Sequence, residues 1–162
     1  MRLFFYIAAA CGTAAFTGAM LTIGLVLGAY WESLPPAEFI DWFAENSYLI
    51  GRVIPLFVIP ALIGLIGGSF CDRRSPRLKF WLASLGCMIG ILIITLVFHL
   101  PTNAAFNTKS IPLGDVGSML AQWLWLHAVR IVLGLAASIL SVVAISDGAK
   151  QIATDPKKAL MI

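Results

Sequence analysis

The segment MLAQWLWLHAVRIVLGLAASILSVVAI, residues 119–145, is a long apolar run that contains only two ionisable side chains, His127 and Arg130. About 20 predominantly apolar residues are enough for a helix to cross the hydrocarbon layer of a bilayer. The segment exceeds that length without a proline or an acidic residue. It therefore predicts a transmembrane helix and, with it, an all-α membrane protein.

Three further apolar runs precede this segment. The chain of 162 residues is 60% hydrophobic and only 12% charged, whereas soluble domains carry about 25% charged residues. The four expected crossings are residues 3–30, 48–70, 78–100 and 119–145. Because the connections are short, sequential helices are expected to pack antiparallel. We therefore expect one transmembrane domain over residues 1–162, a four-helix antiparallel bundle.

A short amphipathic helix is expected between the first and second crossings. Pro35 and Pro36 end the first helix, because proline lacks a backbone donor and disfavours helix in the residue before it. Phe39, Ile40 and Phe43 then recur at helical spacing, opposite a face of acidic residues. This pattern is typical of an interfacial helix that lies in the plane of the lipid headgroups.

Lysines and arginines are distributed unevenly between the two sides of this topology. Lys109 falls alone on one side, with an acidic connection. The opposite side holds Arg2, Arg73, Arg74, Arg77, Lys79, Lys150, Lys157 and Lys158. The positive-inside rule then places both termini in the cytoplasm, and a bacterial inner or plasma membrane is the expected location. Since these basic residues lie beside membrane spans rather than on one folded face, no nucleic-acid partner is expected.

Small residues at helical spacing predict close packing between the helices. Gly24-x-x-x-Gly28 occurs in the first expected crossing and Gly86-x-x-x-Gly90 in the third. Glycine allows two helix backbones to approach closely within a bilayer. The pattern predicts packing faces without identifying the partner of each face.

Four ionisable residues lie within or near the ends of apolar runs: Arg52, His99, His127 and Arg130. Ionisable residues inside a membrane span are costly and by default mark a functional site. Trp123, His127 and Arg130 share one helical face at i, i+4 and i+7. No acidic residue lies within an apolar run. Arg130 therefore binds an anionic ligand, pairs with Glu32 or Glu45 reaching inward, or bonds backbone carbonyls freed by prolines. Arg52 either joins the same pocket or reaches the headgroup phosphates.

Three interpretations of His99 and His127 remain open. General acid–base chemistry suits histidine, because it titrates near neutral pH. A haem or copper centre would need both rings at one metal, and no further ligand accompanies them. We therefore predict no metal site and no cofactor, with haem or copper held by His99 and His127 as the alternative. In the third interpretation both rings only hydrogen-bond neighbouring helices.

The stretch HLPTNAAF at residues 99–106, followed by the pattern Trp123-x-Trp-x-His127-x-x-Arg130, resembles the anthrone-oxygenase-like family. These are four-helix membrane proteins, and most bacterial members are labelled a domain of unknown function. Pro101, Asn103, Trp123 and Arg130 match the family pattern. The resemblance implies a cofactor-poor oxygenase that oxidises an anthrone to an anthraquinone, with a hydroxyaromatic or quinone-like substrate that comes from the lipid.

On this hypothesis the candidate residues form two groups. The catalytic candidates are His127 and His99, and the substrate-binding candidates are Arg130, Asn103, Trp123 and Arg52. The alternative hypothesis is a non-catalytic accessory subunit that packs against a larger membrane complex or forms a homo-oligomer. The glycine pairs and the small size of the chain are compatible with either function.

Overall fold

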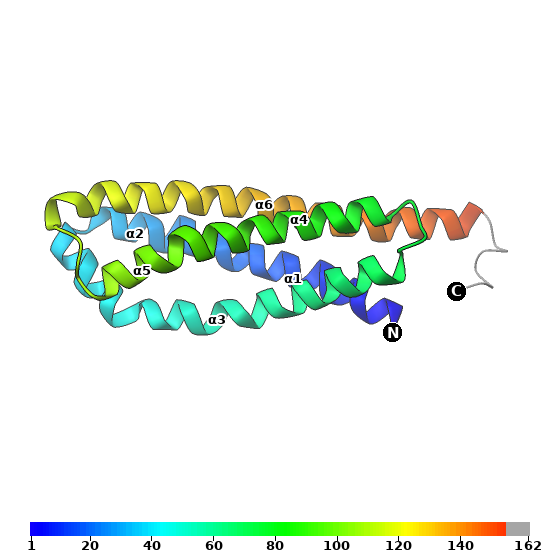
Figure 1. Cartoon of the computed structure of the whole chain (residues 1–162), viewed down its shortest axis with the longest axis horizontal. Coiled ribbons are helices and arrows are strands. Elements are labelled where there is room, and N and C mark those ends of the chain that lie inside the picture. The colour runs from blue at the N-terminus through cyan, green and yellow to red at the C-terminus, as the bar shows by residue number, and fades with distance from the viewer. Residues whose placement is uncertain (155–162) are drawn as a thin grey trace.

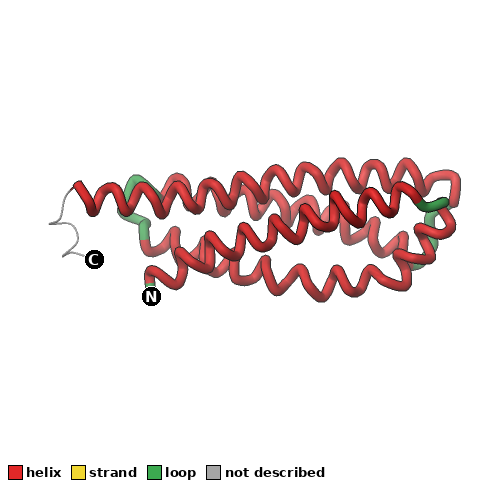
Figure 2. The backbone as a smooth tube through the Cα atoms, turned by 180° about the vertical axis from the view of Figure 1, so that it is seen from behind, coloured by secondary structure: helices red, strands yellow, loops and turns green. Residues whose placement is uncertain are grey.

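The computed structural model describes residues 1–154, which are helical apart from short turns (Figures 1 and 2). Two π-helical segments interrupt the α-helices. The elements are α1 (Arg2–Thr22), η1 (Ile23–Leu27), α2 (Gly28–Ser33), α3 (Pro36–Cys71), α4 (Leu78–Ile94), η2 (Thr95–His99), α5 (Leu100–Asn107) and α6 (Leu113–Thr154). Lys157 and Lys158, which contribute to the predicted membrane orientation, lie outside the described residues.

These elements form four continuous helical stretches that are long and apolar enough to cross a bilayer. They are Arg2–Ser33, Pro36–Cys71, Leu78–Asn107 and Leu113–Asp147. The stretches alternate in direction, and the N-terminus lies near the same end of the bundle as the last turns of α6 (Figure 1). The predicted all-α bundle of four membrane-spanning helices is thus confirmed, and the chain is an integral membrane protein.

The amphipathic segment between the first two crossings differs from its prediction in one respect. It is helical, but it forms the first turns of α3 rather than a separate helix in the headgroup plane. Phe39 and Phe43 are buried. The ring centroid of Phe39 lies 6.0 Å from that of Trp31 and 5.0 Å from that of Phe106. Because its apolar face packs inside the end of the bundle, this segment continues the axis of α3.

Pro101 does not end the third crossing, contrary to its expected boundary near residue 100. The π-helical segment η2 precedes this proline, and the Leu100 N–H bonds the Thr95 carbonyl five residues earlier. Pro101 then occupies the first turn of α5, where a missing backbone donor costs little. The helix therefore continues to Asn107 and carries Asn103 into the bundle.

The predicted glycine pairs have different surroundings. Gly24 and Gly28 in the first crossing face α6: a Cβ on Gly24 would lie 3.0 Å from Cδ2 of His127. Gly86 in α4 would meet no atom within 4 Å. The tightest approach is that of α1 and α3, where a Cβ on Gly12 would lie 2.6 Å from the backbone nitrogen of Ala61. Only the first of the two predicted pairs therefore packs closely within the bundle.

A buried carboxylate closes the end of the bundle near the chain termini. The side chain of Asp72, at the end of α3, is fully buried. It accepts hydrogen bonds from Arg77 Nη2 at 2.9 Å, Trp81 Nε1 at 2.7 Å and the Tyr6 hydroxyl at 2.9 Å. Arg2 lies 3.3 Å away. These donors come from α1, α4 and the turn before α4, so Asp72 joins three membrane-spanning stretches.

Replacing Asp72 with alanine is expected to destabilise the folded bundle by about 3–5 kcal/mol, because it leaves a buried arginine without its partner. Tyr6→Phe is the matched control, since it removes one donor from the same cluster and is expected to cost about 1 kcal/mol. Thermal unfolding in detergent, followed by circular dichroism, measures both. Equal melting temperatures for the two variants would contradict this role of Asp72.

Candidate functional site

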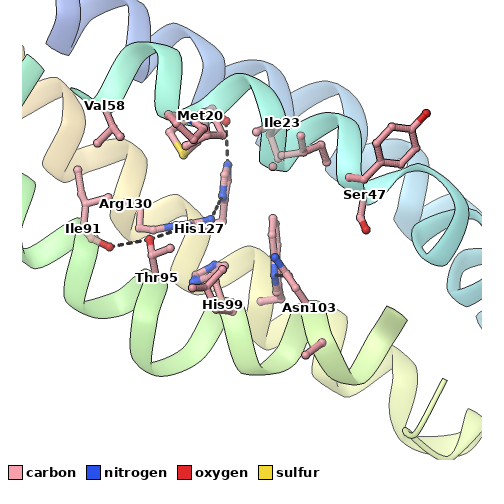
Figure 3. A pocket seen from close by; sticks show the side chains of 18 of the residues that line it. Met20, Ile23, Ser47, Val58, Ile91, Thr95, His99, Asn103, His127 and Arg130 are labelled. Atoms are coloured by element: carbon pink, nitrogen blue, oxygen red, sulfur yellow. Dashed lines mark hydrogen bonds between the residues drawn. The ribbon is translucent and has the colours of Figure 1, made fainter. Parts of the chain in front are cut away.

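A cavity of about 570 Å³ lies between the helices, in the half of the bundle that contains α5, and Figure 3 shows side chains that line it. Its walls are mostly apolar and include Phe16, Phe43, Ile54 and Ile91. The polar residues that line it are Ser47, Thr95, His99, Asn103, Asn107, Trp123, His127, Arg130 and Tyr48. Cavities of about 300–1,000 Å³ with apolar walls and a few polar groups are typical of small-molecule sites.

The cavity opens through the side of the bundle, between α3 and α5. Among its lining residues, Tyr48, Gly51 and Pro55 on α3 and Leu100 and Ala104 on α5 are exposed. Both helices belong to stretches that are long and apolar enough to span a membrane.

Polar bridges join α3 to the end of α5 beyond this opening. Ser47 donates a hydrogen bond to Asn107 at 2.8 Å, and Lys109 pairs with Asp41 at 2.6 Å. The Asp41 carboxylate raises the pKa of Lys109, so Lys109 is charged at neutral pH. These bridges hold the two helices together at one edge of the cavity, which Ser47 and Asn107 line.

Arg130 is the buried cation of the cavity, with 6% of its surface exposed. Its Nη1 donates to the hydroxyl of Thr95 at 3.1 Å and its Nη2 to Nδ1 of His127 at 2.5 Å. Its Nε has no hydrogen-bond partner. The ion pairs found among the described residues do not include Arg130. The positive charge therefore lies beside an apolar cavity without a counter-ion from that part of the chain.

His127 is held at both ring nitrogens. Its Nε2 lies 2.8 Å from the carbonyl oxygen of Met20, and its Nδ1 faces Arg130. A carbonyl only accepts hydrogen bonds and a guanidinium only donates them. His127 is therefore neutral, with its proton on Nε2. The ring also stacks on Trp123, with 5.0 Å between centroids and 10° between planes.

His99, in contrast, has one free ring nitrogen. The residue is 1% exposed, and its Nε2 has no hydrogen-bond partner. Its Nδ1 lies 3.4 Å from the carbonyl oxygen of Ile94. If the neutral ring donates to this carbonyl, Nε2 has the unshared electron pair. Nε2 is itself buried, in a residue that lines the cavity. The ring packs edge-to-face on Trp123, 4.8 Å between centroids.

Asn103 and Trp123 form a third polar contact. Nε1 of Trp123 donates to Oδ1 of Asn103 at 2.8 Å. This bond fixes the orientation of the amide, because the indole can only donate. The guanidinium carbon of Arg130 lies 5.6 Å from the Trp123 ring centroid, within the range of a cation–π contact.

The structure brings five of the six sequence-predicted residues together, and Arg52 is the exception. It is exposed on α3 and does not line the cavity. Its neighbours Gly51 and Ile54 do line the cavity, so Arg52 lies on a different face of the same helix. The position of Arg52 agrees with the interpretation in which it reaches headgroups rather than the ligand.

Sequence reasoning missed the carbonyl of Met20 and the two π-helical segments. Met20 lies in the last turn of α1, three residues before η1 begins at Ile23, and Thr95 and His99 are the first and last residues of η2. Segments of this kind often occur at functional sites. The only sequence signal was Gly24, whose missing side chain allows His127 to reach α1.

A two-histidine metal centre would need a free nitrogen on each ring. The centroids of His99 and His127 are 6.3 Å apart, but both nitrogens of His127 are engaged. No group of three or more potential metal ligands occurs among residues 1–154. A haem or copper ion held by both rings would therefore have to break at least one hydrogen bond of His127.

Comparison with known proteins gives one match. The family model described as anthrone oxygenase matches residues 42–140. This range covers most of the cavity wall, including His99, Asn103, Trp123, His127 and Arg130, but not Met20. No curated protein and no solved structure matches the chain.

Proposed function

Since the chain belongs to the anthrone oxygenase family, we propose that its cavity binds a lipid-soluble hydroxyaromatic or quinone-like compound and oxidises it. One observation carries this proposal: Arg130 is buried beside an apolar cavity of about 570 Å³ and has no counter-ion among the described residues. An uncompensated buried charge is expensive, and a ligand anion would offset that cost.

The anion that suits this cavity is a phenolate or enolate. Its single charged oxygen belongs to a flat apolar ring system, and the walls contributed by Phe16, Ile54 and Ile91 match such a ring. The guanidinium of Arg130 has five N–H donors, of which two have partners within the protein. Nε is buried, so the second N–H groups of Nη1 and Nη2 are the donors left for the oxygen of the ligand, and the positive charge favours its deprotonated form.

His99 is the proton acceptor in this proposal. A general base needs an unshared electron pair within hydrogen-bond reach of the acidic proton. Nε2 of His99 is buried and has no partner among the described residues, and His99 lines the cavity. In this proposal the bound ligand displaces neighbouring side chains and reaches Nε2. Removal of the proton by His99 would give an electron-rich carbanion or enolate, which Arg130 stabilises through its charge.

With an anthrone, the methylene carbon opposite the ketone is the reacting atom. One C–H bond breaks as its proton passes to His99, and the carbanion transfers electrons to dioxygen and forms a C–O bond. The second C–H bond and the O–O bond then break. One oxygen atom becomes the new carbonyl of the anthraquinone, and the other leaves in water with two hydrogens. Dioxygen is thus the only oxidant required.

The ligand would reach this site from the bilayer. The side opening between α3 and α5 supports this route, because its rim is formed by exposed residues of membrane-spanning stretches such as Pro55 and Leu100. We further propose that both termini are cytoplasmic in a bacterial inner membrane. The basic residues near the termini support that orientation, in which the cavity lies in the outer half of the bilayer.

An accessory-subunit function remains the second candidate, and one observation favours it. The face of α4 around Gly86 is open, since a Cβ at this position would meet no atom within 4 Å. Such a face could receive a helix of another membrane protein. Loss of a copurifying partner in Gly86→Leu, with the cavity variants unaffected, would support this function.

The test of the proposed enzyme uses purified protein in lipid nanodiscs and the hydroxyanthrone dithranol. We expect quinone formation above the rate in empty nanodiscs, with one dioxygen consumed for each quinone formed. Heat-denatured protein in the same nanodiscs is the control for spontaneous oxidation. If the protein does not bind dithranol and its rate does not exceed that of the control, the proposal is contradicted.

A further inference from the structure

We infer that His127 is a positioning residue, which aims the guanidinium of Arg130 at the ligand, and that it does not accept the substrate proton. This inference rests on the proposed function. It separates the roles of two buried histidines that the sequence alone treats as equivalent catalytic candidates. The separation depends on what each ring nitrogen contacts.

Both nitrogens of His127 are occupied by partners that leave no choice of tautomer. Nε2 donates to the Met20 carbonyl at 2.8 Å, and Nδ1 accepts from Nη2 of Arg130. A base needs a free electron pair, and the one pair of this neutral ring is directed at Arg130. A substrate proton could therefore reach His127 only after the contact with Arg130 is broken.

The ring is also confined on its face and its edge. One face stacks on Trp123, with 10° between the planes. Along one edge, the space next to Cδ2 is limited by α1, because a Cβ on Gly24 would lie only 3.0 Å from this atom. A ring flip would exchange carbon and nitrogen positions and break both hydrogen bonds. The imidazole is therefore fixed in place between α1 and α6.

This fixed ring determines the direction of Arg130. His127 holds Nη2 on one side, and the hydroxyl of Thr95 holds Nη1 on the other. Thr95 is itself fixed by its bond to the carbonyl of Ile91 at 2.8 Å. The guanidinium is thus oriented by α6 and η2 together. Preorganised donors stabilise a developing anion more than mobile donors do, because they need not reorient during the reaction.

The first part of the test measures the tautomer of His127 without any ligand. The chain contains only two histidines, so ¹⁵N-histidine labelling gives two imidazole signals, and His99→Gln assigns them. In nanodiscs we expect His127 to be neutral, protonated on Nε2, with Nδ1 as a hydrogen-bond acceptor. A proton on Nδ1 would overturn the inference, whatever the protein does with dithranol.

The second part compares His127→Phe with His127→Gln. Phenylalanine keeps a flat ring but makes neither hydrogen bond, so we expect dithranol affinity to fall by about tenfold or more. Glutamine offers one N–H donor and one carbonyl acceptor and is expected to recover most of that loss. The pH profile of turnover should be the same in His127→Gln as in the wild type, because the base is unchanged.

The outcomes separate this inference from the proposed function. If His127→Gln is as impaired as His127→Phe while both variants remain folded, the positioning role is wrong. If the pH profile of His127→Gln changes, His127 takes part in proton transfer and the inference is likewise overturned. If wild-type protein shows the expected tautomer but neither binds nor oxidises dithranol, the positioning of Arg130 stands and the proposed function fails.

Discussion

Replacing Arg130 with glutamine is expected to lower the affinity for a hydroxyaromatic anion and its turnover together, by about two to three orders of magnitude. Truncating one partner of a buried, hydrogen-bonded charge pair typically costs about 2–5 kcal/mol. Glutamine can still bond Thr95, but it supplies no charge to the ligand. The affinity and turnover of Arg130→Lys are expected to lie between those of the wild type and Arg130→Gln, because lysine keeps the charge but lacks the planar fork of donors.

Two features distinguish this loss from a folding defect. The unliganded Arg130→Gln protein is expected to unfold at the same temperature as the wild type or higher, since the buried uncompensated charge is gone. Arg52→Gln is the matched control, because Arg52 is exposed and lies outside the cavity lining. Equal loss of ligand binding in both variants would contradict the assignment of Arg130. Dithranol binding and quinone formation in nanodiscs provide the measurements.

His99→Gln is expected to reduce turnover by about 10²–10⁴-fold, the usual contribution of a positioned general base, while dithranol affinity changes by only a few-fold. The ring of His99 packs on Trp123 and its Nε2 has no partner in the unliganded protein. Its replacement therefore removes a proton acceptor without breaking a bond at Nε2. Glutamine cannot take a proton from a carbon acid.

The informative contrast is between His99→Gln and His127→Gln, the same substitution at two rings in one cavity. Only the first is expected to reduce turnover by about 10²–10⁴-fold. Quinone formation measured at saturating dithranol, with affinity determined separately, divides the effect between chemistry and binding. Full activity in His99→Gln would show that another group accepts the proton.

The sequence was sufficient to predict the membrane fold and most of the cavity. Four apolar runs define the helices, and the i, i+4, i+7 spacing brings Trp123, His127 and Arg130 onto one face. Such patterns depend only on nearby residues, so they can be recognised without knowledge of tertiary packing. The family resemblance around residues 99–130 pointed to the same residues, and the family match includes them all.

Features that depend on contacts between distant segments could not be predicted. Asp72 follows an apolar run in a basic connection, and its burial requires donors from Tyr6 and Trp81 on other helices. The tautomer of His127 depends on the Met20 carbonyl, 107 positions away. The two π-helical segments have no sequence signature. Arg52 was a substrate-binding candidate because it lies in or near an apolar run. Which face of α3 lines the cavity depends on how the helices pack, and the sequence does not show this.

The most direct test of the central claim is the absorption spectrum of a dihydroxyanthraquinone bound to the wild-type protein. This ligand resembles the proposed product, and its phenol and phenolate forms absorb at different wavelengths. The ligand is added to protein in nanodiscs at a fixed pH, about two units below the pKa that the ligand has in empty nanodiscs. The Arg130→Gln variant is measured in parallel. We expect the phenolate spectrum in the wild type, because Arg130 favours the charged form, and the phenol spectrum with Arg130→Gln. A phenol spectrum in the wild type, or binding that is equal in both proteins, would contradict the claim that Arg130 holds a ligand anion.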